Sequence, residues 1–331
     1  MRQASLPDHR PIFPDGLLTV LARGPQTSPR ALAQALGVPE ATVRQGLNTL
    51  RDLGLILHED ADGLIHLDAR LDVLDERGIQ AGFDDPESAP LIQVLEQVDS
   101  TSAWLDRARQ QGARGPLACC ADVQTAGRGR RGRQWLMPPC AGLALSLLWD
   151  TASWPGPDST VTLATGAALV QCLESLGAQG LGLKWPNDIQ MGGLKLGGIL
   201  VEGRLNRGEG GALILGVGLN LRLPGDLPID QPYADLHRAG LDPLPDRSWL
   251  AGRLLQALIR MLETYPEPGF EAWQALWQDR DVCRGRAVTL AGDPAIEGIA
   301  QGVDAAGRLC VETAGGKHWV EAGEVSLRVG A

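Results

Sequence analysis

The sequence predicts three domains: a helical domain with a β-hairpin, a central mixed α/β domain and a small all-β domain. At 331 residues the chain is too long for one ordinary hydrophobic core. Two helical segments and a hairpin come first, strands and helices then alternate, and short strands separated by turns close the chain. We expect the domains at residues 1–70, 91–281 and 282–331, with a linker over residues 71–90.

The N-terminal segment carries start and stop signals for two helices, after a short apolar helix at residues 15–23. Ser28 can cap the first helix, Pro29 suits its first position, and Gly37 can end it. The second helix is expected over residues 40–53. Its core-facing stripe is predicted from three apolar residues at helical spacing, which are Val43, Leu47 and Leu50.

A β-hairpin then completes the pattern of a winged helix-turn-helix. Residues 55–57 and 64–67 flank Asp62-Gly63, a pair typical of hairpin turns. The second helix carries polar side chains of the types that reach bases or phosphates, namely Arg44, Gln45, Asn48 and Arg51. The alternative is a solvated helix face. The wing, residues 58–63, is acidic where a DNA-contacting wing is usually basic, so we expect weak wing contacts.

The linker and the central domain follow. A short helix is expected at residues 70–77, and an acidic, turn-rich boundary at residues 82–88. Strands are predicted at residues 91–98, 116–123, 142–149, 181–185, 196–202 and 212–221, the last three as neighbours in a sheet. Helices are predicted at residues 103–111, from a cap at Asp158-Ser159 to residue 176, and at 248–265 and 270–278. Trp273 and Trp277 are expected to be core residues.

The C-terminal segment consists of short strands separated by Gly-Asp and Ala-Gly turns. They are predicted at residues 286–290, 296–303, 308–313, 317–320 and 325–328. About 50 residues organised in this way are similar to SH3-like β-barrels.

Composition narrows the class of protein. The formal net charge is -10, the hydrophobic content is 44%, and the charged content is 21%, which describes an ordinary soluble protein. No apolar run approaches the roughly 20 residues of a membrane span, and the N-terminus has no signal-peptide core, so a cytoplasmic location is expected. The six cysteines form no C-x-x-C pair, which argues against zinc. Cys119 and Cys120 are expected to be buried thiols.

Residues 127–135, here called the Gly/Arg loop, are the strongest sequence feature. Four arginines and three glycines fall within seven positions, and Trp135 follows. Arginine holds carboxylates and phosphates in a fork, while glycine lets the backbone approach a ligand. The loop is therefore predicted to bind an anion. The alternative is that the loop is exposed and binds only nucleic acid.

The glycines of this loop also spell the dinucleotide-binding pattern G-x-G-x-x-G. That pattern should open a helix, whereas Trp135, Pro138, Pro139 and a strand follow here. We therefore reject a Rossmann site. A Walker A loop is excluded because no Gly-Lys-Ser or Gly-Lys-Thr is present.

Further motifs follow the loop in the chain. They are Lys-Trp-Pro-Asn-Asp at residues 184–188, Lys-Leu-Gly-Gly-Ile-Leu-Val-Glu at 195–202, and Gly-Val-Gly-Leu-Asn-Leu at 216–221. Together with the loop and Asp99-Ser100-Thr101, they resemble the biotin protein ligases in order and spacing from about residue 99 to 328. The helix-turn-helix makes the chain similar to the bifunctional members, which are also biotin operon repressors.

The resemblance implies a class II synthetase-like mixed sheet and a defined reaction. Biotin and ATP, with Mg²⁺, would give biotinyl-5'-AMP, and biotin would then pass to a lysine of a biotin carboxyl-carrier domain in a carboxylase. It implies operator binding by a homodimer when the adenylate is bound. Mg²⁺ would arrive with ATP, without a site made of protein ligands alone.

The resemblance also assigns roles to individual residues. Biotin would be held by Ser100, Thr101, Ser102, Gln124, Arg128, Gly129, Arg130 and Lys195. ATP would be held by Arg131, Arg133, Trp135, Asn220 and Arg328. The catalytic residues would be Lys195, Asp188, Arg130 and Asn187. Many bifunctional members have Asn where this chain has Ser102, so one biotin contact differs.

Some alternatives stay open from the residues alone. Asp188 could orient or deprotonate the acceptor lysine, or it could be a structural partner of Lys184 or Lys195. Trp135 could stack on adenine or pack over the closed loop. Rival functions are a lipoate-type ligase, a non-catalytic biotin sensor, and a ligase whose N-terminal domain binds no operator.

Overall fold

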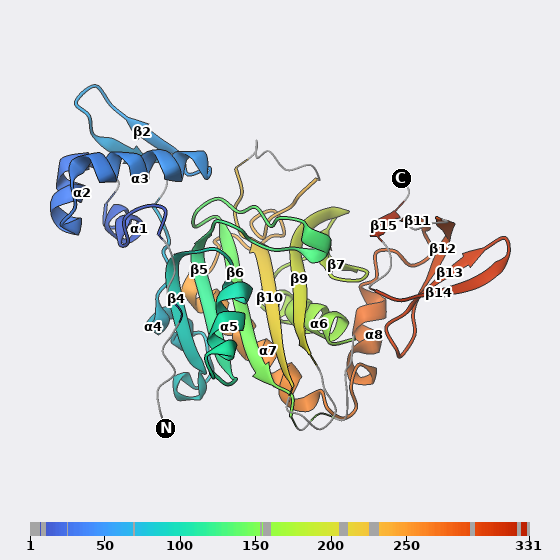
Figure 1. Ribbon diagram of the computed structural model, residues 1–331. Coiled ribbons are helices and arrows are strands. Elements are labelled where there is room, and N and C mark those ends of the chain that lie inside the picture. Colours follow the sequence, from blue (N-terminus) through green and yellow to red (C-terminus); the bar gives the residue numbers. More distant parts are fainter. Residues whose placement is uncertain are drawn as a thin grey trace. The chain divides into compact units, whose positions relative to one another are not determined.

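The computed structural model describes residues 7, 11–24, 26–68, 70–152, 154, 160–204, 211–224, 232–291, 295–322 and 326–329 (Figure 1). These residues form two compact units. The first comprises residues 1–149, 214–230 and 243–253, and the second comprises residues 150–213, 231–242 and 254–331. Among the described residues, no helix has both the length and the apolar character needed to cross a membrane.

The N-terminal part is a winged helix-turn-helix, as predicted. Its helices are α1 (Leu17–Leu21), α2 (Pro29–Leu36) and α3 (Glu40–Asp52). A three-stranded antiparallel sheet in the order β1-β3-β2 contains β1 (Gln26–Thr27), β2 (Leu57–Glu59) and β3 (Ile65–Leu67). The Ser28 hydroxyl caps α2 by accepting from the Ala31 amide at 3.1 Å, and Gly37 ends it with φ 67°. The two-residue strand β1 was not predicted.

The core of this domain forms on the predicted stripe of α3. Val43, Leu47 and Leu50 are at most 1% exposed. Gly46 permits a close approach, because a Cβ there would lie 2.8 Å from the Pro14 side chain. The same cluster includes Leu71 and Val123 from outside the helix-turn-helix segment.

The segment that links this domain to the sheet differs from the prediction. The helix predicted at residues 70–77 was wrong, because α4 runs over Glu76–Ala81 and Asp75 caps it by accepting from the Gly78 amide at 2.9 Å. Leu71 and Leu74 lie in a non-helical segment, and the side chains of both are buried. A short 3-10 helix, η1 (Pro86–Ser88), occupies the predicted turn-rich boundary. The linker is thus packed against the rest of its unit.

Seven strands form a mixed sheet in the order β4-β5-β6-β10-β9-β8-β7. They are β4 (Leu91–Val98), β5 (Leu117–Gln124), β6 (Gly142–Asp150), β7 (Leu181–Lys184), β8 (Asp188–Met191), β9 (Leu194–Arg204) and β10 (Ala212–Asn220). β4 and β5 are parallel, whereas β5 pairs with β6, β7 with β8, and β8 with β9 in antiparallel fashion. The predicted mixed sheet is confirmed. β8 was not predicted and lies between β7 and β9, so of the three strands expected to be neighbours only β9 and β10 are adjacent.

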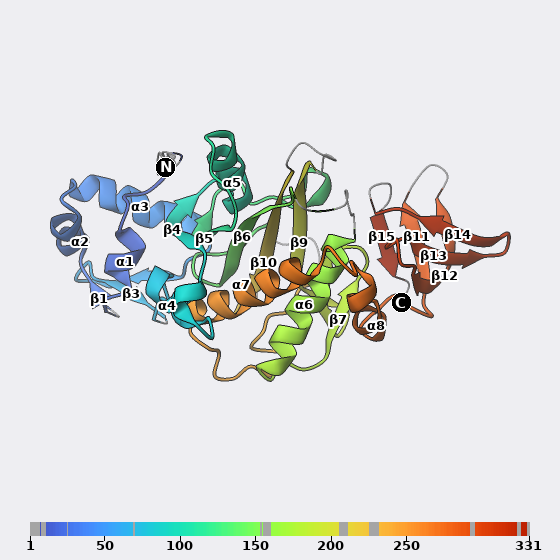
Figure 2. The same ribbon diagram turned by 90° about the horizontal axis from the view of Figure 1, so that it is seen from below.

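Helices cover the sheet within each unit. In the first unit, α5 (Thr101–Gln110) packs on β5, and α4 lies on the other face (Figure 2). In the second unit, α6 (Val161–Ser175) packs on β7 and β9, and α8 (Glu271–Asp279) packs on α6. The long helix α7 runs over Arg247–Thr264. Asp158 and Ser159, the predicted cap of α6, lie outside the described residues. Trp277 is 1% exposed, which confirms it as core, while Trp273 is half-buried.

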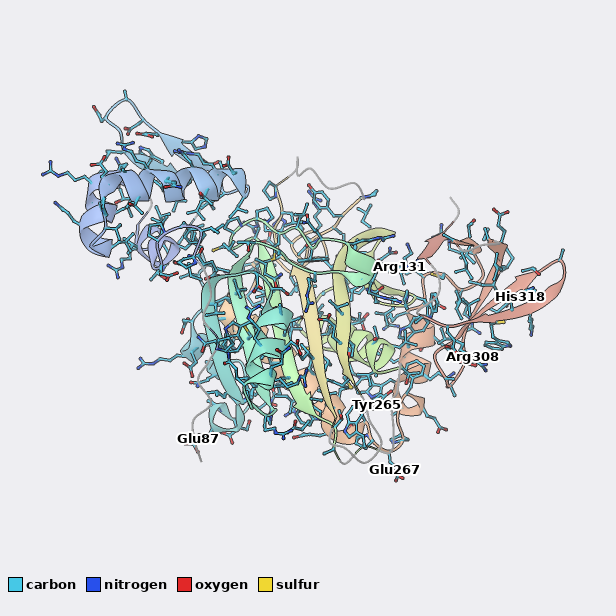
Figure 3. The ribbon with its side chains drawn as sticks, viewed as in Figure 1. Glu87, Arg131, Tyr265, Glu267, Arg308 and His318 are labelled. Atoms are coloured by element: carbon cyan, nitrogen blue, oxygen red, sulfur yellow. The ribbon has the colours of Figure 1, made fainter. Side chains whose placement is uncertain are left out.

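The C-terminal part is the predicted small all-β domain. Its antiparallel sheet has the order β14-β13-β12-β11-β15 and consists of β11 (Ala287–Ala291), β12 (Ile296–Val303), β13 (Leu309–Thr313), β14 (Gly316–Val320) and β15 (Ser326–Val329). Figure 3 labels two side chains of this domain, Arg308 just before β13 and His318 on β14.

Candidate functional site

A buried network of hydroxyl groups forms where β4 gives way to α5. The Thr101 amide and hydroxyl both donate to Gln124 Oε1, at 2.9 and 3.2 Å. Thr101 Oγ1 also lies 2.8 Å from Ser146 Oγ, and Ser102 Oγ lies 2.9 Å from the same atom. The structure therefore brings together Thr101, Ser102 and Gln124, three of the residues predicted to bind biotin.

Ser146 belongs to this network but was not predicted. It lies on β6 and is fully buried. A signal was present in the sequence, because Ser146 is a lone hydroxyl within the otherwise apolar run of residues 142–149. A buried hydroxyl needs a partner, and here the partners are Thr101 and Ser102.

An ion pair fixes the turn that carries these hydroxyl groups. Arg107 donates to the Asp99 carboxylate through both terminal nitrogens, at 2.7 and 2.8 Å. The hydrogen bonds from Arg107 lower the pKa of the Asp99 carboxyl. Ser100, the next residue, donates its amide to Asp99 Oδ1 at 2.8 Å, and its side chain is buried. The start of α5 is thus held in one conformation.

The Gly/Arg loop folds back on itself. The Trp135 amide donates to the Gly127 carbonyl at 2.9 Å, and the Gly129 amide donates to the Arg133 carbonyl at 2.7 Å. Its tip is the short 3-10 turn η2 (Arg130–Gly132), where Arg131 has φ 58°. The chain then enters β6 without forming a helix, which agrees with the rejection of a dinucleotide-binding motif.

Side chains of the loop differ in exposure. Arg128, Arg131 and Arg133 are exposed, and Arg130 is half-buried. Figure 3 shows Arg131 at the tip of the loop. The Trp135 ring packs on β10, because a Cβ at Gly218 would lie 2.4 Å from the ring atom Cε2. Gly218 is therefore required for this contact.

Asn220 and Arg328 were both predicted to lie near the nucleotide. Asn220 is the last residue of β10 and is 4% exposed, in the same unit as the Gly/Arg loop. Arg328 lies on β15 in the second unit, where its backbone pairs with Thr289. The Arg328 side chain lies outside the described part of the chain.

The predicted catalytic residues of the second unit meet on β8 and β9. Lys195 Nζ lies 2.9 Å from Asp188 Oδ1, and both side chains are less than 20% exposed. A bulge between Ile189 and Gln190 shifts the register of the two strands at this point. The backbone of Lys195 is fixed by two hydrogen bonds: its amide donates to the Pro232 carbonyl, and its carbonyl accepts from the Ala234 amide.

Asn187 has a well-defined structural setting beside this pair. Its side-chain amide donates to the Ile199 carbonyl at 2.9 Å, and the Ile199 amide donates to the Asn187 carbonyl at the same distance. Asn187 therefore closes the end of the β8–β9 pair. Its predicted catalytic role stays a prediction.

The candidate DNA-binding face of α3 is engaged with the wing. Arg44 pairs with Glu40 at 3.0 Å and with Glu59 of β2 at 3.2 Å. Arg51 lies 3.9 Å from Glu59 and donates to Asn48 at 2.8 Å. The fourth predicted residue is also on this surface, since Gln45 is exposed. The acidic wing thus contacts the basic residues of the recognition helix directly.

Known families match three parts of the chain. Residues 94–220 match the Biotin/lipoate A/B protein ligase family, residues 285–328 match the Biotin protein ligase C terminal domain, and residues 16–60 match the IclR helix-turn-helix domain. A central mixed sheet of this kind, with a helix-turn-helix before it and a small β-domain after it, defines a protein ligase of the biotin and lipoate class.

Individual relatives narrow the class. The chain is 35% identical over 318 residues to the bifunctional ligase/repressor BirA of Salmonella typhimurium, covering 94% of this chain and 96% of the relative. It is 33% identical over 317 residues to the bifunctional ligase/repressor BirA of Escherichia coli, again covering 94% of this chain and 96% of the relative. The biotin protein ligase of Aquifex aeolicus in complex with biotin and ATP superposes with a TM-score of 0.62 at 28% identity, covering 72% of this chain and 99% of that one. The chain belongs to the biotin protein ligase family.

Proposed function

We propose that the protein activates biotin with ATP to form biotinyl-5'-AMP and then transfers biotin to a lysine of a biotin carboxyl-carrier domain. The family and the relatives named biotin ligases support this proposal. The observation that carries the chemistry is the Lys195–Asp188 pair, held on neighbouring strands at 2.9 Å. A fixed cation beside a fixed carboxylate suits a reaction in which charge develops on phosphate and a lysine must lose a proton.

Recognition of biotin is assigned to the hydroxyl network. A ureido ring offers two N–H donors and one carbonyl acceptor, so it needs partners of both kinds. Ser100, Thr101 and Ser102 can donate or accept, and Gln124 offers an amide. The contacts from Ser146 and Arg107 hold these groups in place before biotin arrives. Such a preorganised site would lose little conformational entropy on binding.

Activation brings two anions together, the biotin carboxylate and the α-phosphate of ATP. We infer that the Gly/Arg loop closes over them, with Arg128, Gly129 and Arg130 holding the carboxylate and then the phosphate. Lys195 would stabilise the charge that grows in the transition state. Closure would also exclude water, which otherwise hydrolyses the adenylate. The contacts to the nucleotide are assigned to Arg131, Arg133, Trp135, Asn220 and Arg328.

Transfer requires a neutral acceptor lysine, because an ammonium group cannot attack the acyl carbon. Asp188 is the residue we assign to orient this amine or accept its proton. Its carboxylate, with the phosphates of ATP, also fits the oxygen ligands that Mg²⁺ prefers. Mg²⁺ would supply neutralisation of phosphate charge. Among the described residues, no group of three His, Cys, Asp or Glu could hold a metal ion.

The enzyme proposal is tested by biotin-dependent exchange of pyrophosphate into ATP with pure protein. Exchange with biotin and none with lipoate is expected. Exchange with lipoate alone would favour a lipoate-type ligase, and no exchange with either acid would favour a biotin sensor. Labelled biotin, ATP and cell lysate would then identify the acceptor as the labelled protein.

For the N-terminal domain we propose operator binding by a homodimer that forms when the adenylate is bound. The helix-turn-helix match and the relatives named ligase/repressors support it. Footprinting on the promoter of a biotin gene at two salt concentrations is the test. Weak binding that is equal for all sequences would contradict a repressor role. Because these reactions use ATP and chromosomal DNA, we infer a cytoplasmic location.

A further inference from the structure

Arg247 is a buried cation that the reaction described above does not use. It is the first residue of α7 and is only 3% exposed. Its Nη1 donates to Asp122 Oδ1 at 2.7 Å, while Nε and Nη2 both donate to the Gly142 carbonyl, at 3.1 and 2.9 Å. Asp122 lies near the end of β5, and Gly142 is the first residue of β6. One guanidinium thus joins two neighbouring strands.

These two strands are the ones from which the Gly/Arg loop extends. The chain leaves β5 after Gln124, forms the loop at residues 127–135, and enters β6 at Gly142. Gln124, two residues after Asp122, accepts both hydrogen bonds from Thr101. Arg247 therefore joins the two strands on either side of the loop, and its partner Asp122 lies on the same strand as Gln124, a predicted biotin contact.

The linker from the helix-turn-helix domain joins the same cluster. Asp72 accepts two hydrogen bonds from Arg247. Its backbone carbonyl accepts from Nη1, and its carboxylate accepts from the Arg247 backbone amide at 2.9 Å. The Leu74 amide donates to Asp122 Oδ1 at 3.2 Å. Val123, between Asp122 and Gln124, packs in the core of the helix-turn-helix domain with Leu71. One side chain thus contacts the two strands that flank the loop and the linker.

An arginine suits this position for a geometric reason. Its planar fork can donate in several fixed directions at once, whereas lysine is a point charge on a flexible stem. A buried ion pair adds little net stability over an apolar pair, and such pairs can instead select one arrangement of the chain. Burial raises the pKa of the Asp122 carboxyl, and the charge of Arg247 opposes that rise.

We propose that Arg247 is a positioning residue for the Gly/Arg loop. Arg247 holds Asp122, Gly142 and the Asp72 backbone in one arrangement. It thereby sets the spacing of the two strands that flank the loop and keeps the loop in an ordered conformation. The part that concerns adenylate retention rests on the proposed ligase function. The part that concerns loop order does not.

Trypsin tests loop order without ligand or activity, because the loop contains four arginines. Arg247→Lys should speed cleavage within residues 128–133 on the order of tenfold relative to cleavage after Arg238, an exposed residue of the second unit. The control is Arg280→Lys, which alters the more exposed pair of Arg280 with Glu174. Loop cleavage at the parent rate, or an equal increase at Arg238, would overturn the proposal.

Retention of the adenylate is the second readout. The full-length protein is loaded with biotin and ATP, and release of biotinyl-5'-AMP is timed after dilution. Arg247→Lys should release it on the order of tenfold faster, with a raised KM for biotin, and Arg280→Lys should match the parent. Release at the parent rate from an Arg247→Lys protein whose loop is more accessible to trypsin would overturn the part of the proposal that concerns adenylate retention.

A second variant, Asp122→Asn, tests the proposal in case Arg247→Lys does not fold. Asp122→Asn keeps the volume and the Oδ1 acceptor that Arg247 and Leu74 use, and removes only the charge. It should shift both readouts in the same direction by a smaller factor, and a change in neither would overturn the proposal. If the parent forms no adenylate but Arg247→Lys still opens the loop to trypsin, the ligase function fails and the positioning role stands.

Discussion

The indole nitrogen of Trp185 donates a hydrogen bond to the carbonyl of Gly307 at 3.1 Å. Trp185 belongs to the Lys-Trp-Pro-Asn-Asp motif and is 1% exposed, while Gly307 lies in the turn between β12 and β13. Gly307 has φ 73°, and a Cβ there would lie 2.6 Å from Thr160. The C-terminal β-domain is therefore held against the strand that leads to Asp188, by a contact that tolerates little change.

Trp185→Phe should lower the free energy of unfolding by about 1–2 kcal/mol, because it leaves the buried Gly307 carbonyl without its donor and removes some packing. Urea denaturation measures this. Trp319→Phe is the matched control, since Trp319 is 48% exposed on β14 and should change stability little. Equal effects of the two substitutions would contradict a specific role for the Trp185 contact.

Lys195→Ala should reduce kcat/KM of biotin-dependent pyrophosphate exchange by about 10²–10³-fold, if Lys195 stabilises charge in the transition state. It also removes the ion pair with Asp188. Lys317→Ala, at an exposed position of β14, makes the same substitution and should leave the rate unchanged. A loss of less than tenfold in Lys195→Ala would show that the cation acts outside the adenylation step.

The sequence predicted most elements because their signals are local. Caps such as Ser28 and the stripe of α3 depend on neighbours within a few residues, and both are confirmed. Strand β8 (Asp188–Met191) was missed although a local signal was present, because the Gly192-Gly193 pair that follows it is typical of a two-residue hairpin turn. Both glycines have positive φ, 57° and 83°, and they join β8 to β9 in an antiparallel hairpin.

The candidate site depends more on contacts between distant segments. Motifs indicated Thr101, Gln124, Asp188 and Lys195. Asp188 and Lys195 meet across a single hairpin, whereas the hydrogen bonds between Thr101 and Gln124 join segments 23 residues apart in sequence. Ser146 lies 45 residues from Thr101 in sequence, so only the fold reveals their contact. The buried partners of Arg247 could not be predicted for the same reason, and the helix wrongly predicted at residues 70–77 gave way to them.

Ser146→Ala should raise the KM for biotin on the order of fivefold to tenfold, because Thr101 and Ser102 lose the hydroxyl that orients them. The kcat of pyrophosphate exchange should change less than the KM, since Ser146 acts through residues that bind biotin. Ser175→Ala removes a hydroxyl that donates to the Cys172 carbonyl in the second unit and serves as control. A KM equal to that of the parent would exclude Ser146 from biotin recognition.

Asp281 makes stability depend on pH. Burial raises the pKa of its carboxyl to about 6, and its Oδ2 has no hydrogen-bond partner within the described part of the chain. Because the folded state binds this proton more tightly than the unfolded state, the free energy of unfolding should fall as pH rises from about 4 to about 6. Above that range the loss is complete.

Asp281→Asn removes the charge and keeps an acceptor for the Cys283 amide. Relative to the parent, it should gain at least ~1 kcal/mol in free energy of unfolding at pH 7.5, and this gain should vanish near pH 4. Urea denaturation at both pH values measures it. The control is Asp279→Asn at an exposed position of α8. A gain that is equal at the two pH values would contradict titration of Asp281.

The acidic wing should weaken DNA binding through Glu59, whose carboxylate contacts Arg44 and Arg51 on the recognition helix. The hydrogen bond that Arg44 donates to the Glu59 carboxylate raises the pKa of Arg44, so this arginine stays charged and can bind a DNA phosphate in place of Glu59. DNA phosphates must displace Glu59 to reach the arginines, and they are also repelled by its charge. Glu59→Gln should therefore lower the Kd for duplex DNA about threefold to tenfold in ~0.1 M salt, as fluorescence anisotropy can measure.

Glu87→Gln separates this local effect from net charge. Glu87 is exposed on η1 and has no part in the wing (Figure 3), so the substitution changes the net charge equally. It should leave the Kd nearly unchanged, because Glu87 lies on η1, outside the helix-turn-helix segment, and salt screens an exposed charge. Arg44→Ala should weaken binding of every sequence, as expected for a phosphate contact. Equal tightening by the two glutamine variants would assign the effect to total charge, and weaker binding by Glu59→Gln would mean that the Glu59 pairs hold the recognition helix in its binding conformation.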